Sequence, residues 1–555
     1  MSVNSIVQLL VSQQVAPTPA TLQQCGAIIS QGATNTSQFT ASYLTQLSDL
    51  TSLLTGTKAV TSATWLTGTA TITTTAPHGF TNGDSLWLTL AGFSPAAWNG
   101  SYLCTVTGAS TFTFALASNP GAMTVAGTYT EEDVAEVLAA ATTFFGQGST
   151  TGISVLELGP GNPNDGVAAL TTYLTNNPNS AYTAGATGYF YSYLVPRTWD
   201  GNANFLALIA SYEAPSAKTY FYVTTTLQNY GLYTNLMKCV KLFVEDPAYG
   251  VWSANALTAA TYASGQVTLT TTTAHGVAVG QWFKISGMTP AAWNGWYQAQ
   301  LGTTGSTLIA NVLTNPGTET ALGTLVASYY ASAGIPTLEF SAASDLWVNL
   351  NRKPSTTNKV TPNRFGFVYG VTPFPVQGNS SLLYTLSQAN VNYIGLGYEG
   401  GISGTMIVPG TTMDGNDFTY WYSVDWVQLN CDLMLSNAVI NGSNNPINPL
   451  YYNQAGIDRL QAVAAQVLNN GITFGMVLGP VVQTQLDGPV LAAAIAAGTY
   501  NGMTVINAVP FLTYSQENPT HYKIGLYQGL SIYYVPARGF ANILINLTVS
   551  NIVAS

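Results

Sequence analysis

The sequence predicts an α+β multi-domain protein in which a mixed α/β core is interrupted by two small all-β modules. With 555 residues, the chain is longer than a single hydrophobic core usually organises, so several domains are expected. A stretch of β-type sequence occurs twice, and the sequence outside the two copies alternates between strand and helix patterns. These two observations and the length together define the fold class.

The duplicated stretch is marked by a hexapeptide, Pro95 to Gly100, that recurs unchanged as Pro290 to Gly295. Each copy contains short segments rich in Thr, Val, Ile, Phe and Tyr, separated by Gly, Asn and Pro, which is typical of a small sandwich or barrel. The copies are too far apart to stack as a solenoid, so we interpret them as modules inserted into loops of the core. They resemble the immunoglobulin-like decorations of phage tail proteins.

The repeat also predicts the roles of four aromatic side chains. His78 and His275 hold equivalent positions before a glycine, so we expect each ring nitrogen to bond a backbone group and fix a turn, with metal or sugar binding as the alternative. One large aromatic residue usually forms the core of a small β domain. Trp98 and Trp293 are therefore expected to be buried, and a sugar-stacking role is the alternative.

Between and after the modules, the periodicity is that of an α/β protein. Glu131 to Phe145 places its apolar residues on one helical face, and the strands and helices that follow have βαβ spacing. Two long helices are expected near the C-terminus, one with Ser423 as its N-cap and one from Gln454 to Asn470 that stops at Gly471. The closing stretch from Tyr522 to Val553 is expected to be β.

These patterns divide the chain into five expected segments. Residues 1–60 hold an N-terminal arm and the start of the core, and residues 61–130 form the first β module. Residues 131–258 form an α/β domain, residues 259–328 form the second β module, and residues 329–555 form a C-terminal α/β domain with a C-terminal arm.

Charged residues are scarce along the whole chain. Only 6% of the residues are Asp, Glu, Lys or Arg, against about 25% in average soluble proteins. A surface built from hydroxyl and amide groups resembles a wet protein interface, which favours a protein that assembles. The net charge of −10 and the absence of a Lys/Arg cluster argue against nucleic acid as a partner.

The sequence gives little indication of a membrane span, a secretory signal or disulfide bonds. No apolar run approaches the ~18–20 residues that span a bilayer, so no membrane insertion by this chain is expected. No Lys or Arg precedes Lys58, so a secretory signal is not indicated and the protein is expected to stay in the cytoplasm where it is made. The cysteines are far apart, and we expect them to be reduced, buried packing residues: Cys25, Cys104, Cys239 and Cys431.

A search for catalytic motifs finds little. No dinucleotide, P-loop, HExxH or GxSxG motif occurs, and His521 follows an expected turn. Two of Asp414, Asp417 and Asp425 would supply the paired carboxylates of a glycoside hydrolase. The first two, however, are interpreted first as a turn or loop before a helix. We therefore expect no enzymatic activity, no cofactor and no metal site.

Several segments outside the modules resemble the sheath proteins of contractile phage tails, which are related to those of R-type bacteriocins and type VI secretion. The resemblance rests on the order of these segments: Phe144 to Gly148 before the strand 153–158, Tyr193 to Asp200, Asn390 to Tyr393, Asp414 to Asn437 with Val424-Asp425-Trp426, and Arg538 before the strand 543–549. The two β modules depart from the family pattern, which leaves their role open.

This resemblance implies a structural subunit that forms stacked hexameric rings around a tail tube and contracts to drive the tube through the host envelope. The implied partners are further copies of the chain, the tail tube protein, and the baseplate and tail terminator proteins. The implied location is the virion tail, assembled in the host cytoplasm.

The family also implies that the N- and C-terminal segments of neighbouring subunits add strands to a sheet of the C-terminal domain. The sequence of both ends is compatible with such arms, because apolar residues nearly alternate with polar ones. An edge strand within the same subunit is the alternative. The expected linking residues are Val3, Val7, Leu9, Val11, Ile543, Ile545, Leu547 and Val549.

A second functional class is compatible with the β modules and the aromatic content. The β modules, 32 Tyr and 11 Trp also suit a carbohydrate-binding tail adhesin or spike, with optional hydrolase activity. A third interpretation, an S-layer-like lattice protein, is weakened by the missing export signal.

Overall fold

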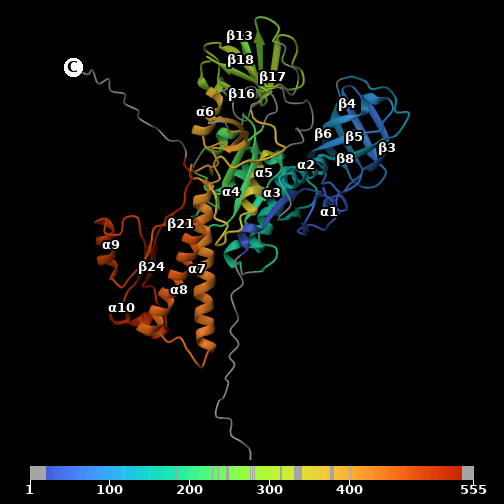
Figure 1. Ribbon diagram of the computed structural model, residues 1–555. Coiled ribbons are helices and arrows are strands. Elements are labelled where there is room, and N and C mark those ends of the chain that lie inside the picture. The colour runs from blue at the N-terminus through green and yellow to red at the C-terminus, as the bar shows by residue number, and fades with distance from the viewer. Residues whose placement is uncertain are drawn as a thin grey trace, which may run out of the picture.

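The computed structural model describes residues 21–540, apart from short internal gaps. The gaps are at 117, 149–150, 183–184, 228, 235–236, 246–248, 276, 278, 280–281, 313–314, 330–339, 375–379 and 400–401. The molecule is a mixed α+β protein with several sheets (Figure 1). Two β modules lie at one end, and a helical C-terminal part lies at the other.

A six-stranded sheet forms the centre of the core, in the order β12-β11-β10-β1-β9-β2. The first five strands in that order are parallel, and β2 pairs antiparallel with β9 at the edge. All five parallel strands are fully buried, as expected for a sheet covered on both faces. The strands are β1 Gly26–Ser30, β2 Ala41–Leu44, β9 Ile153–Glu157, β10 Ser192–Leu194, β11 Tyr220–Thr225 and β12 Val240–Val244.

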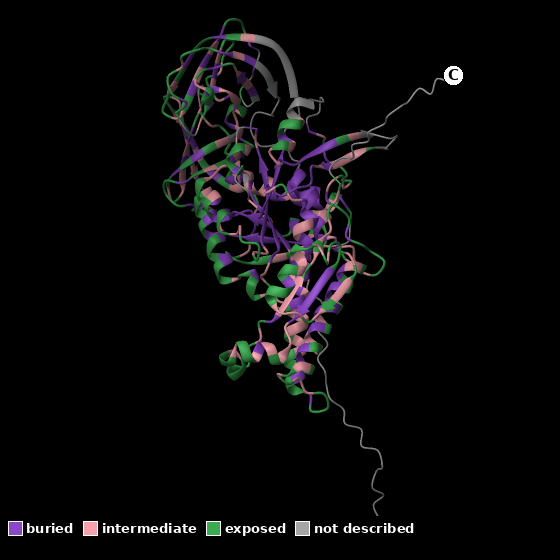
Figure 2. Ribbon diagram, turned by 90° about the vertical axis from the view of Figure 1, so that its left-hand side faces the viewer, coloured by how far each residue is buried: buried purple, intermediate pink, exposed green. Residues whose placement is uncertain are grey.

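Helices cover both faces of this sheet. Neighbouring residues of β1 illustrate the two sides: Ile28 packs with α2 and α5, whereas Ile29 packs with α3 and α4. Figure 2 shows the buried strands at the centre of the molecule. The core helices are α1 Leu47–Thr51, α2 Glu132–Gly146, α3 Pro163–Asn176, α4 Ala203–Ala210, α5 Ser341–Leu350 and α6 Ser380–Gln388.

The first β module is a closed six-stranded barrel with its own core around Trp98. An immunoglobulin-like fold, the expectation for both modules, has two separate sheets, so this expectation is wrong for the first module. The barrel closes because the long strand β3 pairs with both β4 and β8 and is bulged between Val60 and Ser62. The strands are β3 Lys58–Leu66, β4 Thr69–Thr74, β5 Ser85–Ala91, β6 Gly100–Gly108, β7 Thr111–Ala115 and β8 Thr128–Glu131.

The second module repeats this strand order as β16-β15-β18-β13-β14-β17 around Trp293. Among its described residues, β16 and β17 do not pair, so the six strands form an open sheet. The strands are β13 Tyr249–Ala263, β14 Gln266–Thr271, β15 Trp282–Ser286, β16 Gly295–Gln298, β17 Thr307–Asn311 and β18 Thr324–Tyr329.

Equivalent side chains make equivalent bonds in the two modules. The Nδ1 atom of His78 accepts a hydrogen bond from the Phe80 amide at 3.1 Å, and that of His275 accepts one from the Val277 amide at 2.9 Å. The indole nitrogens of Trp98 and Trp293 donate to the carbonyls of Gly121 and Gly317 at 3.1 and 3.0 Å. Both indoles are buried. The turn-fixing role of the histidines and the core role of the tryptophans are therefore confirmed.

The C-terminal part is built on two long helices, α7 Phe418–Asn444 and α8 Gln454–Thr473, which pack side by side (Figure 1). A three-stranded sheet, β22-β23-β24, packs on α8. The remaining elements are β19 Tyr393–Glu399, β20 Ile402–Val408, β21 Val477–Leu478, β22 Val481–Thr484, α9 Gly488–Ala496, β23 Thr504–Ala508, α10 Phe511–Glu517, α11 Pro519–Ile524, β24 Leu530–Tyr533 and β25 Val535–Pro536. Short 3₁₀ turns are η1 Leu22–Gln24, η2 Ala96–Trp98, η3 Asn179–Ala181, η4 Arg197–Trp199, η5 Tyr230–Tyr233 and η6 Ala291–Trp293.

Three expectations for this part were wrong. The N-cap of α7 is Asp417, whose carboxylate accepts from the Thr419 amide at 2.7 Å, and Ser423 lies inside the helix. Helix α8 continues past Gly471 to Thr473, so this glycine does not end the helix. It allows close packing instead, because a Cβ there would lie 2.8 Å from Val477 Cγ2. Between Tyr522 and Phe540 the chain holds the end of α11 as well as short strands.

Candidate functional site

The eight linking residues expected in the arms lie outside the described residues. These are Val3, Val7, Leu9, Val11, Ile543, Ile545, Leu547 and Val549. What the structure does place is the body from which each arm would emerge and the surfaces near those points.

Both ends of the described chain lie beside the first turns of α7. Near the N-terminal end, the side chain of Gln23 donates to the Tyr422 carbonyl at 2.8 Å. Near the C-terminal end, the guanidinium carbon of Arg538 lies 4.4 Å from the centre of the Tyr420 ring. Two described segments that are distant in sequence therefore both contact the start of α7.

A groove of about 310 Å³ runs beside this region, between α7, α8 and η1. Its walls are mainly apolar and aromatic. The lining includes Gln23, Tyr422, Trp426, Met434, Val467 and Phe474.

The three-stranded sheet of the C-terminal part has two open edges. Strand β23 is fully buried and pairs on both sides, parallel with β22 and antiparallel with β24. Among the described residues, no strand pairs with the outer edge of β22 or of β24, and both strands are only partly buried. The side chain of Gln461 on α8 donates to the carbonyls of Thr484 and Ile506, both at 2.8 Å, which fixes the sheet on the helix. An open, well-supported edge is a template for an added strand.

Helix α9 exposes an apolar surface beside this sheet. Its nine residues include no polar side chain, yet only Leu491 is buried. Val490 is 53% exposed. Other large apolar side chains are exposed on the same C-terminal part: Val439, Ile440, Ile447, Tyr451, Leu478, Leu512, Tyr522 and Ile524. Such a concentration of exposed apolar groups is typical of an interaction surface.

The three carboxylates considered for hydrolysis are engaged separately. Asp414 accepts from the Trp421 indole at 2.7 Å, and Asp417 caps α7. Asp425 is buried and accepts from the hydroxyls of Tyr191 and Tyr220, both at 2.8 Å. Burial raises the pKa of Asp425 to about 6, and the tyrosine bonds oppose that rise. His521 bonds the Tyr514 hydroxyl at 2.8 Å.

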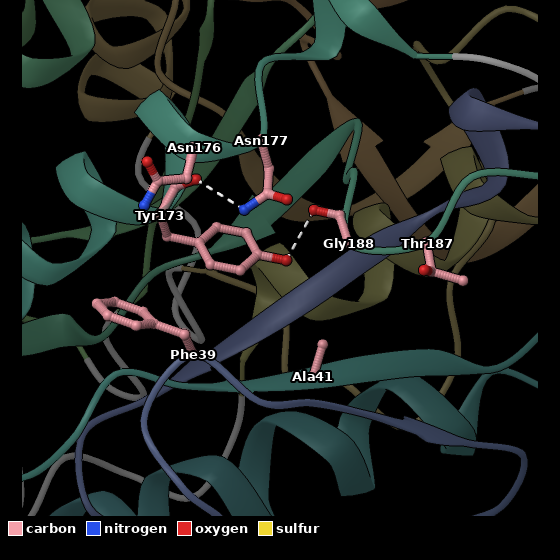
Figure 3. A pocket seen from close by; sticks show the side chains of 7 residues that line it. All are labelled: Phe39, Ala41, Tyr173, Asn176, Asn177, Thr187 and Gly188. Carbon is pink, nitrogen blue, oxygen red and sulfur yellow. Dashed lines mark hydrogen bonds between the residues drawn. The ribbon is translucent and has the colours of Figure 1, made fainter.

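A surface pocket of about 320 Å³ lies between the edge strand β2 and the end of α3 (Figure 3). Phe39 forms one wall, with its ring stacked on that of Tyr173 at 6.3 Å. The Tyr173 hydroxyl donates to the Gly188 carbonyl at 2.7 Å, and the Asn177 amide donates to the Tyr173 carbonyl at 3.0 Å. No charged side chain lines this pocket; the lining residues are Phe39, Ala41, Tyr173, Asn176, Asn177, Thr187 and Gly188.

Phe39 has an unusual backbone conformation, with φ of +66°. A bulky residue rarely adopts this left-handed region, and strain of this kind is often found at functional positions. The position is held because the Phe39 amide donates to the Glu157 carbonyl at 2.7 Å.

No family model matches the sequence, and no curated protein matches it. Within the described residues, no group of three His, Cys, Asp or Glu side chains is arranged to hold a metal ion. None of the helices described is both long and apolar enough to cross a membrane.

The sequence interpretation missed several features that the structure brings together. Phe39 has no motif around it, and its strained φ has no sequence signal. Lys241 and Asp345 form a fully buried ion pair in the core, although the whole second module separates them in the sequence. A lysine within the apolar segment Val240–Val244 is the sequence signal that could have indicated this buried pair.

Proposed function

We propose that this protein is the structural subunit of a contractile tail sheath. In this function it polymerises as stacked hexameric rings around the tail tube and contracts to drive the tube through the host envelope. Its partners are copies of itself, the tail tube protein, and the baseplate and tail terminator proteins. It acts in the virion tail, which is assembled in the host cytoplasm, and it has no active site of its own.

The observation that carries this proposal is the pair of open edges on the β22-β23-β24 sheet. Both ends of the described chain lie beside the first turns of α7. The outer edges of β22 and β24 are partly exposed, so they are available as acceptors for arms from neighbouring subunits. Each main-chain hydrogen bond of an added strand contributes about 0.5–1.5 kcal/mol net. Repetition of the link around every ring lets weak contacts hold the assembly together while the subunit bodies rotate.

The surface chemistry supports the same proposal. A helix without polar side chains, α9, and the other exposed apolar residues of the C-terminal part become buried when subunits assemble. The two β modules lie away from this part, at the opposite end of the molecule (Figure 1). In the proposed assembly they are peripheral decorations, consistent with self-contained cores that include Trp98 and Trp293.

The test is to remove each arm separately and to image the products by negative-stain electron microscopy. The full chain is expected to form rings or tubes. Removal of Ser2–Ser12 or of Asn542–Ser555 is expected to leave a folded, soluble monomer that forms no tubes. Intact tubes from both truncated proteins would contradict the arm mechanism, and isolated elongated trimers or monomers from the full chain would contradict the sheath proposal.

A carbohydrate-binding adhesin is the second candidate, and the Phe39 pocket is the observation that favours it. An exposed aromatic ring beside amide and hydroxyl groups, without charge, suits a neutral sugar. Phe39→Gly removes the ring and relieves the strained φ of +66°. Phe365→Gly is a matched control, because Phe365 also has a positive φ, of +62°, and is exposed outside this pocket.

Titration with glucose, galactose and N-acetylglucosamine, followed by NMR or calorimetry, tests this candidate. An adhesin would bind at least one sugar, and Phe39→Gly would lose binding while Phe365→Gly would keep it. Lack of binding by the wild-type protein, or equal binding by both variants, would contradict the assignment of this pocket.

A further inference from the structure

Lys241 and Asp345 form an ion pair in the centre of the core. Lys241 is the second residue of β12, and Asp345 lies in α5, which covers that face of the sheet. The exposed fraction of both side chains is 0%. Apart from each other, neither Lys241 Nζ nor Asp345 Oδ2 has a hydrogen-bond partner in the part of the chain that the structure describes.

Aromatic rings enclose the amine. Lys241 Nζ lies 4.6 Å from the centre of the Phe418 ring, 5.5 Å from that of Tyr222 and 5.9 Å from that of Phe243. Burial among these rings lowers the pKa of Lys241 and favours its neutral, nucleophilic form, although the charge of Asp345 opposes this effect. Moving both charges out of water costs free energy that their attraction repays only in part. An uncharged product would remove that cost.

The two oxygens of Asp345 have different surroundings. Oδ1 accepts hydrogen bonds from the side-chain amides of Asn363 at 2.9 Å and Asn349 at 3.2 Å, whereas Oδ2 faces the lysine. The Asn363 amide is held in this orientation because its oxygen accepts from Arg352 at 3.1 Å. Two fixed amide donors on one oxygen, with an amine on the other, form the arrangement that stabilises the oxyanion in acyl transfer.

We propose that Lys241 and Asp345 condense to form an intramolecular isopeptide bond. The lysine nitrogen forms a bond to Cγ of Asp345, and the bond from Cγ to Oδ2 breaks. Oδ2 leaves as water with two of the three ammonium protons, and the third proton stays on the amide nitrogen. Oδ1 remains as the amide oxygen, bonded to Asn349 and Asn363. The reaction needs no oxidant, reductant or cofactor.

The bond would close a covalent ring around the second module. Strand β12 leads into this module and α5 follows it, so the bond joins the two sides of its base. Force or unfolding in the module would then not separate β12 from α5. This inference does not depend on the proposed sheath function.

Mass spectrometry of the denatured full chain tests the proposal directly. The wild-type protein is expected to be lighter than its sequence mass by one water molecule. Trypsin is expected to leave Lys241 uncut and to release a branched peptide in which Cys239–Lys284 is joined to Ile285–Arg352, since no other Lys or Arg lies inside these segments. The full sequence mass with separate peptides, cut after Lys241, would overturn the proposal.

The Lys241→Arg variant is the matched control, because it keeps the positive charge but lacks the nucleophilic amine. It is expected to have its full sequence mass and to yield no branched peptide. Loss of one water that persists in this variant would show dehydration elsewhere in the chain and would also overturn the proposal. The wild-type measurement alone decides the matter if this variant fails to fold.

Discussion

Lys58 Nζ donates a hydrogen bond to Glu131 Oε1 at 2.9 Å, so the first residue of β3 is tied to the last residue of β8 at the base of the first barrel. The Glu131 side chain is only 6% exposed, whereas Lys58 reaches solvent. Burial raises the pKa of Glu131 to about 7, although the bond to Lys58 lowers it. The junction between the barrel and helix α2 is therefore sensitive to protonation near neutral pH.

The variant Glu131→Gln is expected to lose part of the pH dependence of stability. The folded-state pKa is above the ordinary value of 4.5, so the contribution from proton binding is full below pH 4.5 and is lost as the pH rises through about 7. The upper limit of this contribution is roughly 3 kcal/mol. Urea unfolding of both proteins across this range measures it. A stability difference that stays constant with pH would contradict the prediction.

Replacement of the buried tryptophans by alanine is expected to destabilise the two β modules to similar degrees. Trp98→Ala and Trp293→Ala each remove a large core side chain and a hydrogen bond to a glycine carbonyl. Each change is expected to cost about 3–5 kcal/mol within its own module. Hydrogen exchange should show faster exchange in the altered module alone. Equal loss of protection in β1 and β9 would mean that the module and the core unfold together.

Deletion of either module is expected to leave a folded core. Lys58 pairs with Tyr129 at the base of the first module, and Tyr249 pairs with Tyr329 at the base of the second. A short Gly/Ser link replacing residues 59–128 or 250–328 therefore spans a short distance. Circular dichroism and electron microscopy should show folded protein that still forms tubes. Insoluble protein from either deletion would contradict the interpretation as insertions.

Two glycines of the C-terminal part are expected to respond in opposite ways to alanine. Gly471→Ala places a methyl group 2.8 Å from Val477 Cγ2 and 3.4 Å from Trp426, so it should destabilise by about 1–3 kcal/mol. Gly488→Ala meets no atom within 4 Å in helix α9 and should be neutral or stabilise by up to about 1 kcal/mol. The unfolding temperatures of the two variants and of the wild-type protein measure these effects. Equal effects would show that α8 and Val477 do not pack as found.

If the chain assembles as proposed, its tubes are expected to persist at high salt. Only 6% of the residues are charged, and exposed ion pairs contribute about 0–1 kcal/mol each. Subunit contacts should therefore be mainly apolar and hydrogen-bonded, and these are not screened by salt. Light scattering at increasing sodium chloride concentration measures the assembly. Dissociation into monomers at molar salt would be decisive evidence for an ionic interface.

Local sequence patterns predict those features whose contacting residues are close in sequence or belong to the repeat. The duplicated Pro95 to Gly100 hexapeptide predicted two related β modules, and the equivalence of His78 with His275 predicted a shared turn contact that both histidines make. Each of these depends on side-chain alternation or turn chemistry within a few residues, which the sequence displays directly.

Tertiary structure alone decided the features that depend on distant partners. Gly26–Ser30 is too short to reveal that it lies between β10 and β9 at the centre of the sheet. Gly471 resembled a helix end until the position of Val477 showed that close packing excludes a side chain there. Lys241 meets Asp345 because the insertion of a whole module leaves β12 and α5 adjacent in space. A one-dimensional pattern records the chemistry of each residue, whereas burial and pairing are set by which segments the fold brings together.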